Sequence, residues 1–516
     1  MEFSYSAIFA TLLFLVPLLL FKFNRKSNPS GAAAAPPPPG PTKLPIIGNL
    51  HNIAGGSLPH HRLRDLAKRY GGVMGLQLGQ VPHLVITSAE AAREVMKTHD
   101  VVFAQRPKML AAEILSYNFT DIAFAPYGAY WCQLRKICVL ELLSAKRVKS
   151  FGSIREEEVS NAVTRIADSA GREFNFSRML FSLTHGITAR VAFGKKYNGQ
   201  DEFIPVVEDI TRAGGGFSLA DLYPSVKLLQ VVSGMRSTLL RLRGETDRML
   251  GSIIADHRSK GSKEDSAAGE VDDLVDVLLK LQGNGELDFP LTDDNIKAVI
   301  FDIFIAGSDT SSTTLEWAMS EMVKNHTVLY EAQAEVRKVF GPKGEVDETL
   351  LHELHYMRLV IKETLRLHAP VPLLLPRENN EDCEIDGFLV KAKTKVIVNV
   401  WAMGRDPKYW KEPEEFRPDR FIDSLIDYKG SDFEFLPFGA GRRMRPGMVF
   451  GMANVELPLA KFLYHFDWEM AGGIKAGDLD MEESFGATLT RKNDLKLIPI
   501  PIPAKFMLYI GGINKK

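Results

Sequence analysis

The chain has 516 residues, of which 45% are hydrophobic and 25% are charged, and its formal net charge is −1 at pH 7. This is an ordinary globular composition, and the near-zero charge excludes the basic field that favours nucleic-acid binding. The three cysteines, Cys132, Cys138 and Cys383, are odd in number and form no CxxC pair. We therefore expect a reducing compartment and neither a disulfide framework nor a zinc site.

An uncharged run opens the chain. Residues 3–21 read FSYSAIFATLLFLVPLLLF, and Lys22, Arg25 and Lys26 follow them. As a helix this run is roughly 28 Å long, close to the about 30 Å of a bilayer's hydrocarbon core. The positive flank predicts that the rest of the chain lies in the cytosol. A cleaved signal peptide is the alternative, but its positive charge would precede the apolar run. We predict a transmembrane anchor with a basic flank over residues 1–26.

A proline-rich segment, AAAAPPPPGPTKL, separates this anchor from the remaining chain. Because prolines stop a helix and favour extended geometry, residues 27–43 are predicted to form a hinge. No later linker divides the chain, so residues 44–503 are predicted to form one domain, mostly helical with small sheets. Residues 259–269 are polar and small and predict a surface loop. Residues 504–516 form a C-terminal extension to which the sequence assigns no role.

Helical periodicity dominates this domain, and its strand-like runs are short. VPHLVIT at residues 81–87 and TKVIVNVWAM from Thr394 predict short strands, whereas residues 155–170 and 328–340 have helical periodicity. The longest predicted helix begins at a Thr292 cap and ends near Asn325. Its middle reads GSDTSSTT, a run of weak helix formers. Taken alone, this run is either a buried polar patch bonded to carbonyls one turn back or a place where Gly307 lets a ligand approach.

Several short patterns place charged and aromatic residues at spacings that bring their side chains together. WCQLRK places Trp131 and Arg135 four residues apart, and KETLR places Glu363 and Arg366 on one helical face. Arg420, in the loop FRPDRF, can reach the second pair. Alone each pattern is commonplace. Near the C-terminus, PFGAGRRMRPGM crowds glycines and arginines into a loop suited to wrapping a ligand closely.

Together, in this order along the chain, the patterns resemble those of the cytochrome P450 family, and plant microsomal members in particular. AGSDTS is similar to the family's oxygen-binding helix, and ETLR with Arg420 to its E-x-x-R triad. FGAGRRMRPG is similar to the haem loop F-x-x-G-x-R-x-C-x-G at every fixed position except Arg445, which occupies the position of the iron-ligating cysteine. The resemblance implies the P450 fold as a single large catalytic domain behind the anchor.

The resemblance also implies roles for single residues. Asp309 and Thr310 match the acid–alcohol pair that delivers protons beside bound oxygen. Glu363, Arg366 and Arg420 match a structural trio. The residues that match contacts of haem b (iron protoporphyrin IX) are Trp131, Arg135, Arg377, Phe438, Arg443 and, at the iron, Arg445. Residues that match the substrate pocket are Ile303, Ala306, Val371, Leu374 and Ala487.

The implied reaction is hydroxylation of a small hydrophobic substrate, a terpenoid of plant specialised metabolism, with O2 and NADPH. The implied partner is NADPH-cytochrome P450 reductase, and the implied location is the endoplasmic reticulum membrane, with the catalytic domain facing the cytosol. Arginine has no lone pair for iron, so no intact metal ligand remains. We expect weak or abnormal haem binding and no turnover by this chain. The alternative is a catalytically dead, haem-poor binding protein that keeps the fold, and a peroxidase or isomerase-type relative is disfavoured by the Asp309–Thr310 pair.

Overall fold

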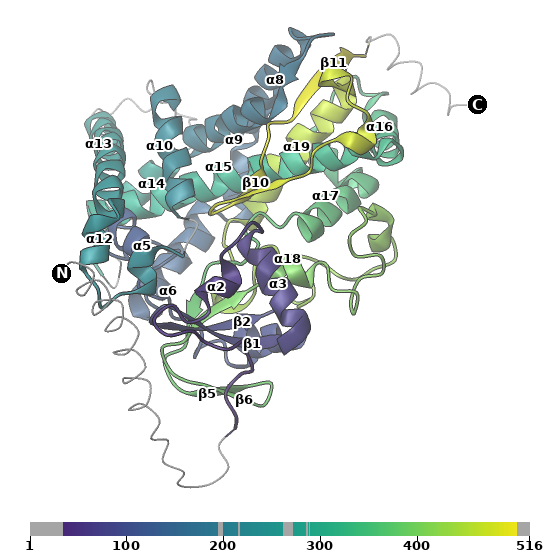
Figure 1. The fold of residues 1–516 in the computed structure, drawn as a ribbon. Coiled ribbons are helices and arrows are strands. Elements are labelled where there is room, and N and C mark those ends of the chain that lie inside the picture. The colour runs from purple at the N-terminus through teal and green to yellow at the C-terminus, as the bar shows by residue number, and fades with distance from the viewer. Residues whose placement is uncertain are drawn as a thin grey trace, which may run out of the picture.

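A computed structural model describes residues 35–194, 200–214, 217–261, 272–284, 287 and 289–502. Helices make up most of the molecule, and small sheets gather beside them (Figure 1). The predicted class, mostly helical with small sheets, is confirmed. The predicted anchor and the C-terminal extension lie outside the described residues. Within the described ranges, no helix is both long enough and apolar enough to cross a bilayer.

The helices are α2 (Leu50–Ile53), α3 (Pro59–Tyr70), α4 (Ala89–Arg93), α5 (Leu110–Leu115), α6 (Ala129–Ile137), α7 (Ala145–Ser150), α8 (Gly152–Ala167), α9 (Phe176–Phe193), α10 (Gln200–Ala213), α11 (Leu219–Leu222), α12 (Leu228–Val232), α13 (Met235–Gly261), α14 (Leu274–Asn284), α15 (Asp293–Lys324), α16 (His326–Phe340), α17 (His355–Leu367), α18 (Val400–Met403) and α19 (Met448–His465). The strands are β1 (Val73–Leu78), β2 (Val81–Ile86), β3 (Phe174–Asn175), β4 (Arg377–Glu378), β5 (Cys383–Ile385), β6 (Phe388–Val390), β7 (Lys395–Val398), β8 (Phe466–Met470), β9 (Glu483–Phe485), β10 (Leu489–Arg491) and β11 (Lys496–Pro501).

The largest sheet has the strand order β1-β2-β7-β4. Strands β1 and β2 form an antiparallel hairpin, β2 pairs with β7 in parallel, and β4 closes the edge antiparallel to β7. The described part of the proline-rich segment lies against this sheet, because the Gly75 amide donates to Pro39 O at 2.8 Å. The remaining strands form the sheets β3-β11-β8, β9-β10 and β5-β6.

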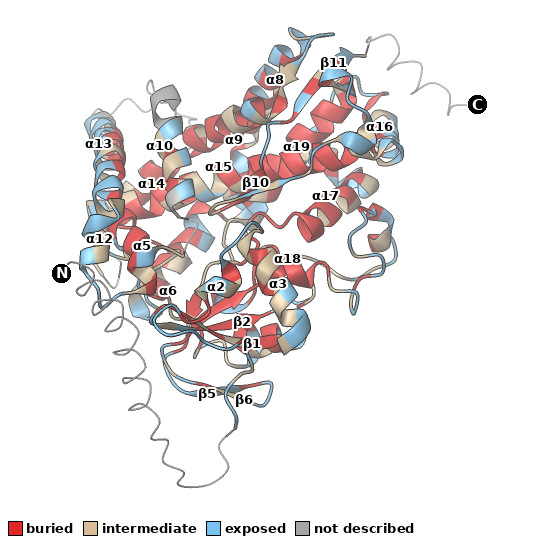
Figure 2. Cartoon of the chain, viewed as in Figure 1, coloured by how far each residue is buried: buried red, intermediate tan, exposed pale blue. Residues whose placement is uncertain are grey.

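Helix α15 runs through the middle of the helical part, and its residues are mostly buried (Figures 1 and 2). The predicted cap is confirmed: the Thr292 hydroxyl accepts from the Asn295 amide, and the Asn295 side chain accepts from the Thr292 amide. The weak helix-forming run stays helical because its hydroxyls bond to carbonyls one turn back, as in Ser308 to Phe304 O at 2.7 Å and Ser311 to Gly307 O at 2.8 Å.

Two sequence-based expectations about local structure are corrected. The strand predicted from Thr394 through Met403 stops at Val398, since the Asn399 side chain accepts from the Ala402 amide and caps the short helix α18. The loop predicted over residues 259–269 begins later, because α13 continues to Gly261. Residues 262–269 of that expected loop lie outside the described ranges.

Candidate functional site

The glycine-rich loop before α19 is tightly folded. Its Arg445 amide donates to Phe438 O at 3.1 Å, and the half-buried Phe438 ring packs on Tyr428 with ring centroids 5.6 Å apart. Gly441 has a φ of 67°, and a Cβ there would lie only 2.1 Å from Met96 O. No other residue type fits this position without moving the backbone. The loop geometry therefore depends on the glycine that the sequence supplies.

The Arg445 side chain occupies the position where the resemblance implies a thiolate. The side chain is half-buried, and its Nη1 donates to Pro437 O at 3.1 Å. Burial lowers the pKa of Arg445 to about 10, so the group stays charged at neutral pH. The neighbouring Met444 sulfur faces elsewhere, since a Cβ on Gly430 would lie 3.1 Å from it. Cys132, Cys138 and Cys383 are outside the loop.

Two predicted arginines converge behind this loop. Arg443 is buried over the Trp131 ring at 4.2 Å, and it donates to Ala104 O at 2.8 Å and to Ala125 O at 2.6 Å. Its Nη1 is buried and has no partner among the described residues. Arg377, also buried, donates to Asp100 Oδ1 at 3.1 Å and to Ala440 O at 2.8 Å. Burial, then the Arg377 charge, lowers the pKa of Arg443 to about 9.

A further arginine, Arg106, belongs to this cluster although the sequence analysis did not single it out. Its Nε donates to Ala123 O at 2.8 Å, and its Nη1 donates to the carbonyls of Leu375 and Pro376 at 2.9 and 2.7 Å. Burial and the charges of nearby arginines lower its pKa well below the usual value. Among the described residues, no carboxylate lies within ion-pair distance of Arg106, Arg135, Arg443 or Arg445. Such a cluster suits a ligand with carboxylates of its own.

The helix α6 supplies Trp131 and Arg135, which lie on one face as the spacing predicts, with the guanidinium 5.4 Å from the ring centroid. Trp131 is buried, and its Nε1 donates to Ile122 O at 3.0 Å. This indole therefore positions the loop at Ile122 and braces Arg443, and its N–H is already used within the protein. The haem contact that the resemblance implies for Trp131 stays a prediction.

Asp309 and Thr310 lie on α15 but point to different surroundings. Asp309 is buried and accepts from Thr211 Oγ1 at 2.9 Å and from Thr488 Oγ1 at 3.4 Å. Burial raises the pKa of Asp309 to about 6. Thr310 is half-buried and donates to Ala306 O at 2.7 Å, and Ala306 is exposed despite its place in the central helix. Ala306 and Thr310 therefore mark an open side of α15.

Replacing Asp309 with asparagine is expected to stabilise the protein at pH 8 and to change little at pH 4. The native chain holds this proton more tightly than the unfolded chain between pH 3.8 and about 6, so native stability falls as pH rises through that window. Asparagine removes the buried charge, which lowers the free energy of unfolding of the parent by up to about 3 kcal/mol above this window. Urea unfolding of both chains at the two pH values measures the difference, and an equal effect at both would contradict this assignment.

Glu363, Arg366 and Arg420 form a buried cluster, as their spacing allows. Arg366 donates to both carboxylate oxygens of Glu363 at 2.7 and 2.8 Å, and Arg420 Nε donates to Glu363 Oε1 at 2.9 Å. The side chains of Glu363 and Arg366 are fully buried. Arg366 also donates to backbone carbonyls at Gly404, Pro413 and Glu415. The cluster thereby ties α17 to the loop that follows α18.

Three predicted pocket residues, Val371, Leu374 and Ala487, line a cavity of about 110 Å³. The wall is largely apolar and includes Met109, Phe124, Phe217 and Phe485, with His83, Asp221 and Lys395 as charged or polar members. Ile303 and Ala306 are not part of this wall; Ile303 is buried in α15. The predicted substrate residues thus fall into two groups, one at the cavity and one on α15.

Comparisons with known proteins agree with this architecture. The family model described as cytochrome P450 matches residues 38–497. The chain is 53% identical to desmethyl-deoxy-podophyllotoxin synthase of Sinopodophyllum hexandrum, over 94% of this chain and 95% of that protein. It is 51% identical to premnaspirodiene oxygenase of Hyoscyamus muticus, over 97% and 98%.

Among solved structures, a zebrafish cytochrome P450 with abiraterone superposes with a TM-score of 0.73 at 25% identity, covering 86% of this chain and 99% of that one. The residues that the family model matches, 38–497, include the largest sheet, the central helix α15 and the glycine-rich loop. The chain therefore belongs to the cytochrome P450 family of monooxygenases.

Proposed function

We propose that this chain is a haem-dependent hydroxylase of small hydrophobic substrates whose iron ligand has been lost at Arg445. The observation that carries the proposal is the arginine cluster behind the glycine-rich loop, with the buried Arg443 Nη1 left without a described partner. A buried guanidinium nitrogen is costly without an anion. The two carboxylates of a haem supply such anions at this place.

The residues present fit one part of the haem and not another. Arg106, Arg135 and Arg443 would hold its carboxylates. When bound through a thiolate, haem supplies activation of O2. At the iron position, however, stands a guanidinium that stays protonated and offers no lone pair. Residue 445 therefore cannot bind haem iron, and we assign no turnover to the chain with arginine at this position.

Asp309 and Thr310 retain the chemistry that the family reaction needs. With a pKa raised to about 6, Asp309 can both take and release a proton near neutral pH. Thr310 keeps its hydroxyl on the open side of α15, where it can hold a water molecule. Because both residues are retained, we infer a recent loss of the iron ligand and not a long-established role without catalysis.

The apolar cavity at Val371, Leu374 and Ala487 favours a substrate bound by burial with few polar anchors. One relative at 51% identity is named premnaspirodiene oxygenase and another salviol synthase. These names support a terpenoid as the substrate class. The cavity's phenylalanines, Phe124, Phe217 and Phe485, are suited to a hydrocarbon skeleton.

Association with the endoplasmic reticulum membrane is part of the proposal. Besides the anchor expected over residues 1–26, the short helix α12 exposes Leu228, Val231 and Val232 at 67%, 68% and 72%. Ile46, exposed at 73%, belongs to the same area, since Tyr223 Oη donates to Ile46 O at 3.4 Å. An exposed apolar patch of this kind favours a lipid surface. Electrons would come from NADPH through the membrane-bound reductase.

The test of the function is reconstitution of the Arg445→Cys chain in lipid vesicles with NADPH-cytochrome P450 reductase and a panel of terpene hydrocarbons. A product heavier by one oxygen atom is expected, and mass spectrometry detects it. Thr310→Val in the same background is the matched control and should consume NADPH with less product. Turnover by the unaltered chain would contradict the proposal.

A second candidate function is a haem-poor binding protein that keeps the fold. The charged Arg445 at the iron position favours it. The two candidates differ in the haem bound after purification from cells supplied with excess haem precursor. Absence of haem from both the unaltered chain and Arg445→Cys would support the binding protein.

A further inference from the structure

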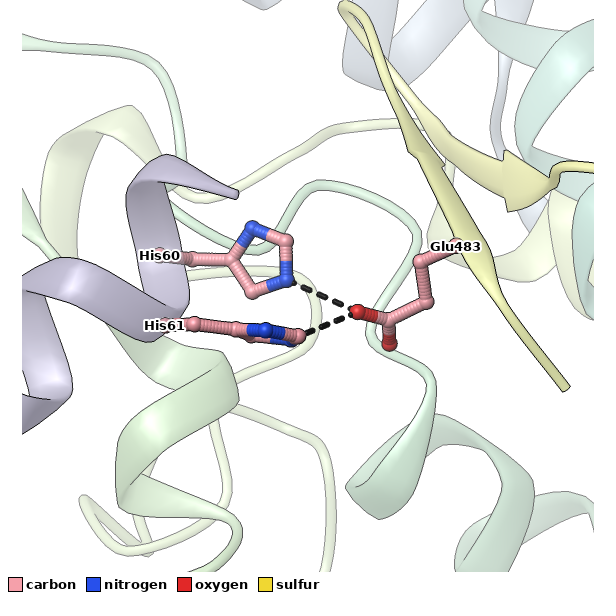
Figure 3. Close-up of side chains that lie close together, drawn as sticks. All are labelled: His60, His61 and Glu483. Atoms are coloured by element: carbon pink, nitrogen blue, oxygen red, sulfur yellow. Dashed lines mark hydrogen bonds and ion pairs between the residues drawn. The ribbon is translucent and has the colours of Figure 1, made fainter. Parts of the chain in front are cut away.

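Two adjacent histidines and a distant glutamate converge at the start of α3. His60 Nε2 and His61 Nε2 lie 2.9 and 2.8 Å from the same oxygen, Glu483 Oε2 (Figure 3). The histidines come from the first turn of α3, and Glu483 begins β9, more than 400 positions later. The fold therefore brings two imidazole nitrogens and one carboxylate oxygen to a single point.

The surrounding residues hold these three side chains in place. The other carboxylate oxygen, Glu483 Oε1, accepts from Trp401 Nε1 at 3.1 Å, so Oε2 alone faces the histidines. The His60 ring is fully buried between Trp401 and Phe485, with ring centroids 4.8 and 5.8 Å away. The backbone of α3 is fixed as well, because Asn399 Nδ2 donates to His60 O at 2.8 Å. Outer contacts of this kind orient metal ligands.

Glu483 lies in the field of Arg405, whose charge helps to lower the pKa of this carboxylate, but no arginine forms a direct ion pair with it among the described residues. Arg64 and Arg405 flank the Trp401 ring, but both pair with Glu414, at 3.4 and 3.1 Å. Within the described part of the chain, the ion-pair partners of Glu483 are the two histidines alone. His60 Nδ1 is buried without a described partner, a cost that hydrogen bonding through Nε2 only partly offsets.

We propose that His60, His61 and Glu483 form a zinc site with one position left for solvent. Two imidazoles and a carboxylate are ligands that zinc prefers. At metal–ligand distances of about 2.0 Å, tetrahedral ligand atoms lie roughly 3.3 Å apart, so separations of 2.8 and 2.9 Å need to widen only slightly. His61 is 28% exposed and gives the ion a path from solvent. The absence of a zinc site was expected from the cysteines alone, and this cluster contains none.

Zinc at this position would connect α3 to a wall of the apolar cavity. Glu483 opens the β9-β10 hairpin, and the following Phe485, Gly486 and Ala487 line the cavity. The tip of the hairpin also contacts α10, since the Ala487 amide donates to Thr211 O at 3.1 Å. A metal ion would thus fix the hairpin that shapes the cavity, whether or not haem is bound.

The test is zinc binding by the full chain, purified in neutral detergent without a polyhistidine tag and treated with a chelator. Titration calorimetry with zinc chloride and elemental analysis should find about one zinc ion per chain. His61→Ala and Glu483→Gln should each weaken binding at least about 10-fold, the loss seen even when outer contacts are removed. Hydrogen exchange in residues 483–491 should slow when zinc is added to the parent.

Two other variants serve as matched controls. His51→Ala removes an exposed histidine near α3, and His257→Ala removes a buried histidine that bonds to Asp273 in a separate cluster. Both should bind zinc as the parent does. His61→Ala alone carries the test if Glu483→Gln fails to fold. A parent that binds no zinc, or His61→Ala binding as tightly as His51→Ala, would overturn the proposal and leave the cluster as hydrogen bonds only.

Discussion

Replacing Arg445 with cysteine is expected to give a chain with nearly stoichiometric haem and the carbon monoxide difference band of a thiolate-ligated iron. The side chain at this position already lies in the loop that Gly441 and the Arg445–Phe438 hydrogen bond hold in shape. The exchange removes a half-buried cation, whose pKa burial lowers to about 10, and supplies a thiolate in its place. The positive iron then stabilises the thiolate instead of repelling a guanidinium. Difference spectra of reduced protein with and without carbon monoxide provide the measurement.

Arg445→Ser is the matched control for this experiment. Serine has nearly the size and shape of cysteine and removes the same charge, but it gives iron no sulfur. Its haem content should rise above that of the unaltered chain while the thiolate band stays absent. A thiolate band in the unaltered chain would mean that another sulfur reaches the iron. Equal spectra for the serine and cysteine variants would show that the loop does not place residue 445 at the iron.

Much of the site could be predicted because its parts are local in sequence. The Thr292 cap, the three-residue spacing of Glu363 and Arg366, and the glycines of the haem-type loop each depend on neighbours within a few positions. Local hydrogen bonding also explains why GSDTSSTT remains helical. Such features follow from helix geometry and backbone sterics, and both can be read from residues that are neighbours in the sequence.

The remaining parts of the site depend on contacts between distant segments. Thr211 and Thr488 reach Asp309 across 98 and 179 positions, and neither threonine belongs to a recognisable pattern. Arg106 joins the arginine cluster only because its segment folds against Ala123 and Leu375. The Trp131 N–H donates to the backbone at Ile122, a partner that the four-residue spacing of Trp131 and Arg135 does not indicate. Sequence spacing gives the direction of a side chain and not its partner.

Replacing Glu363 with glutamine is expected to prevent stable folding of the whole domain. Glu363 accepts from Arg366, from Arg420 and from the Arg417 amide, at 2.7 to 2.9 Å. Glutamine keeps the shape but removes the charge, and its amide group turns one acceptor into a donor facing arginines. Breaking a buried ion pair from one side costs about 3–5 kcal/mol, a large share of the about 5–15 kcal/mol that stabilises a typical domain. The loss should appear as aggregation, or as a strongly lowered unfolding midpoint in circular dichroism.

Arg417→Ala is the matched control, because it changes an arginine of the same loop whose side chain points away. The Arg417 side chain is 46% exposed and pairs with Glu412, and only its backbone amide bonds to Glu363. This variant should therefore unfold within about 1 kcal/mol of the parent, as expected for an exposed ion pair. If Glu363→Gln instead folds as stably as Arg417→Ala and loses only haem or activity, the trio acts at the cofactor and does not hold the fold. The full burial of Glu363 and Arg366, and the bonds from Arg366 to the carbonyls of Pro413 and Glu415, favour a role of the trio in holding the fold.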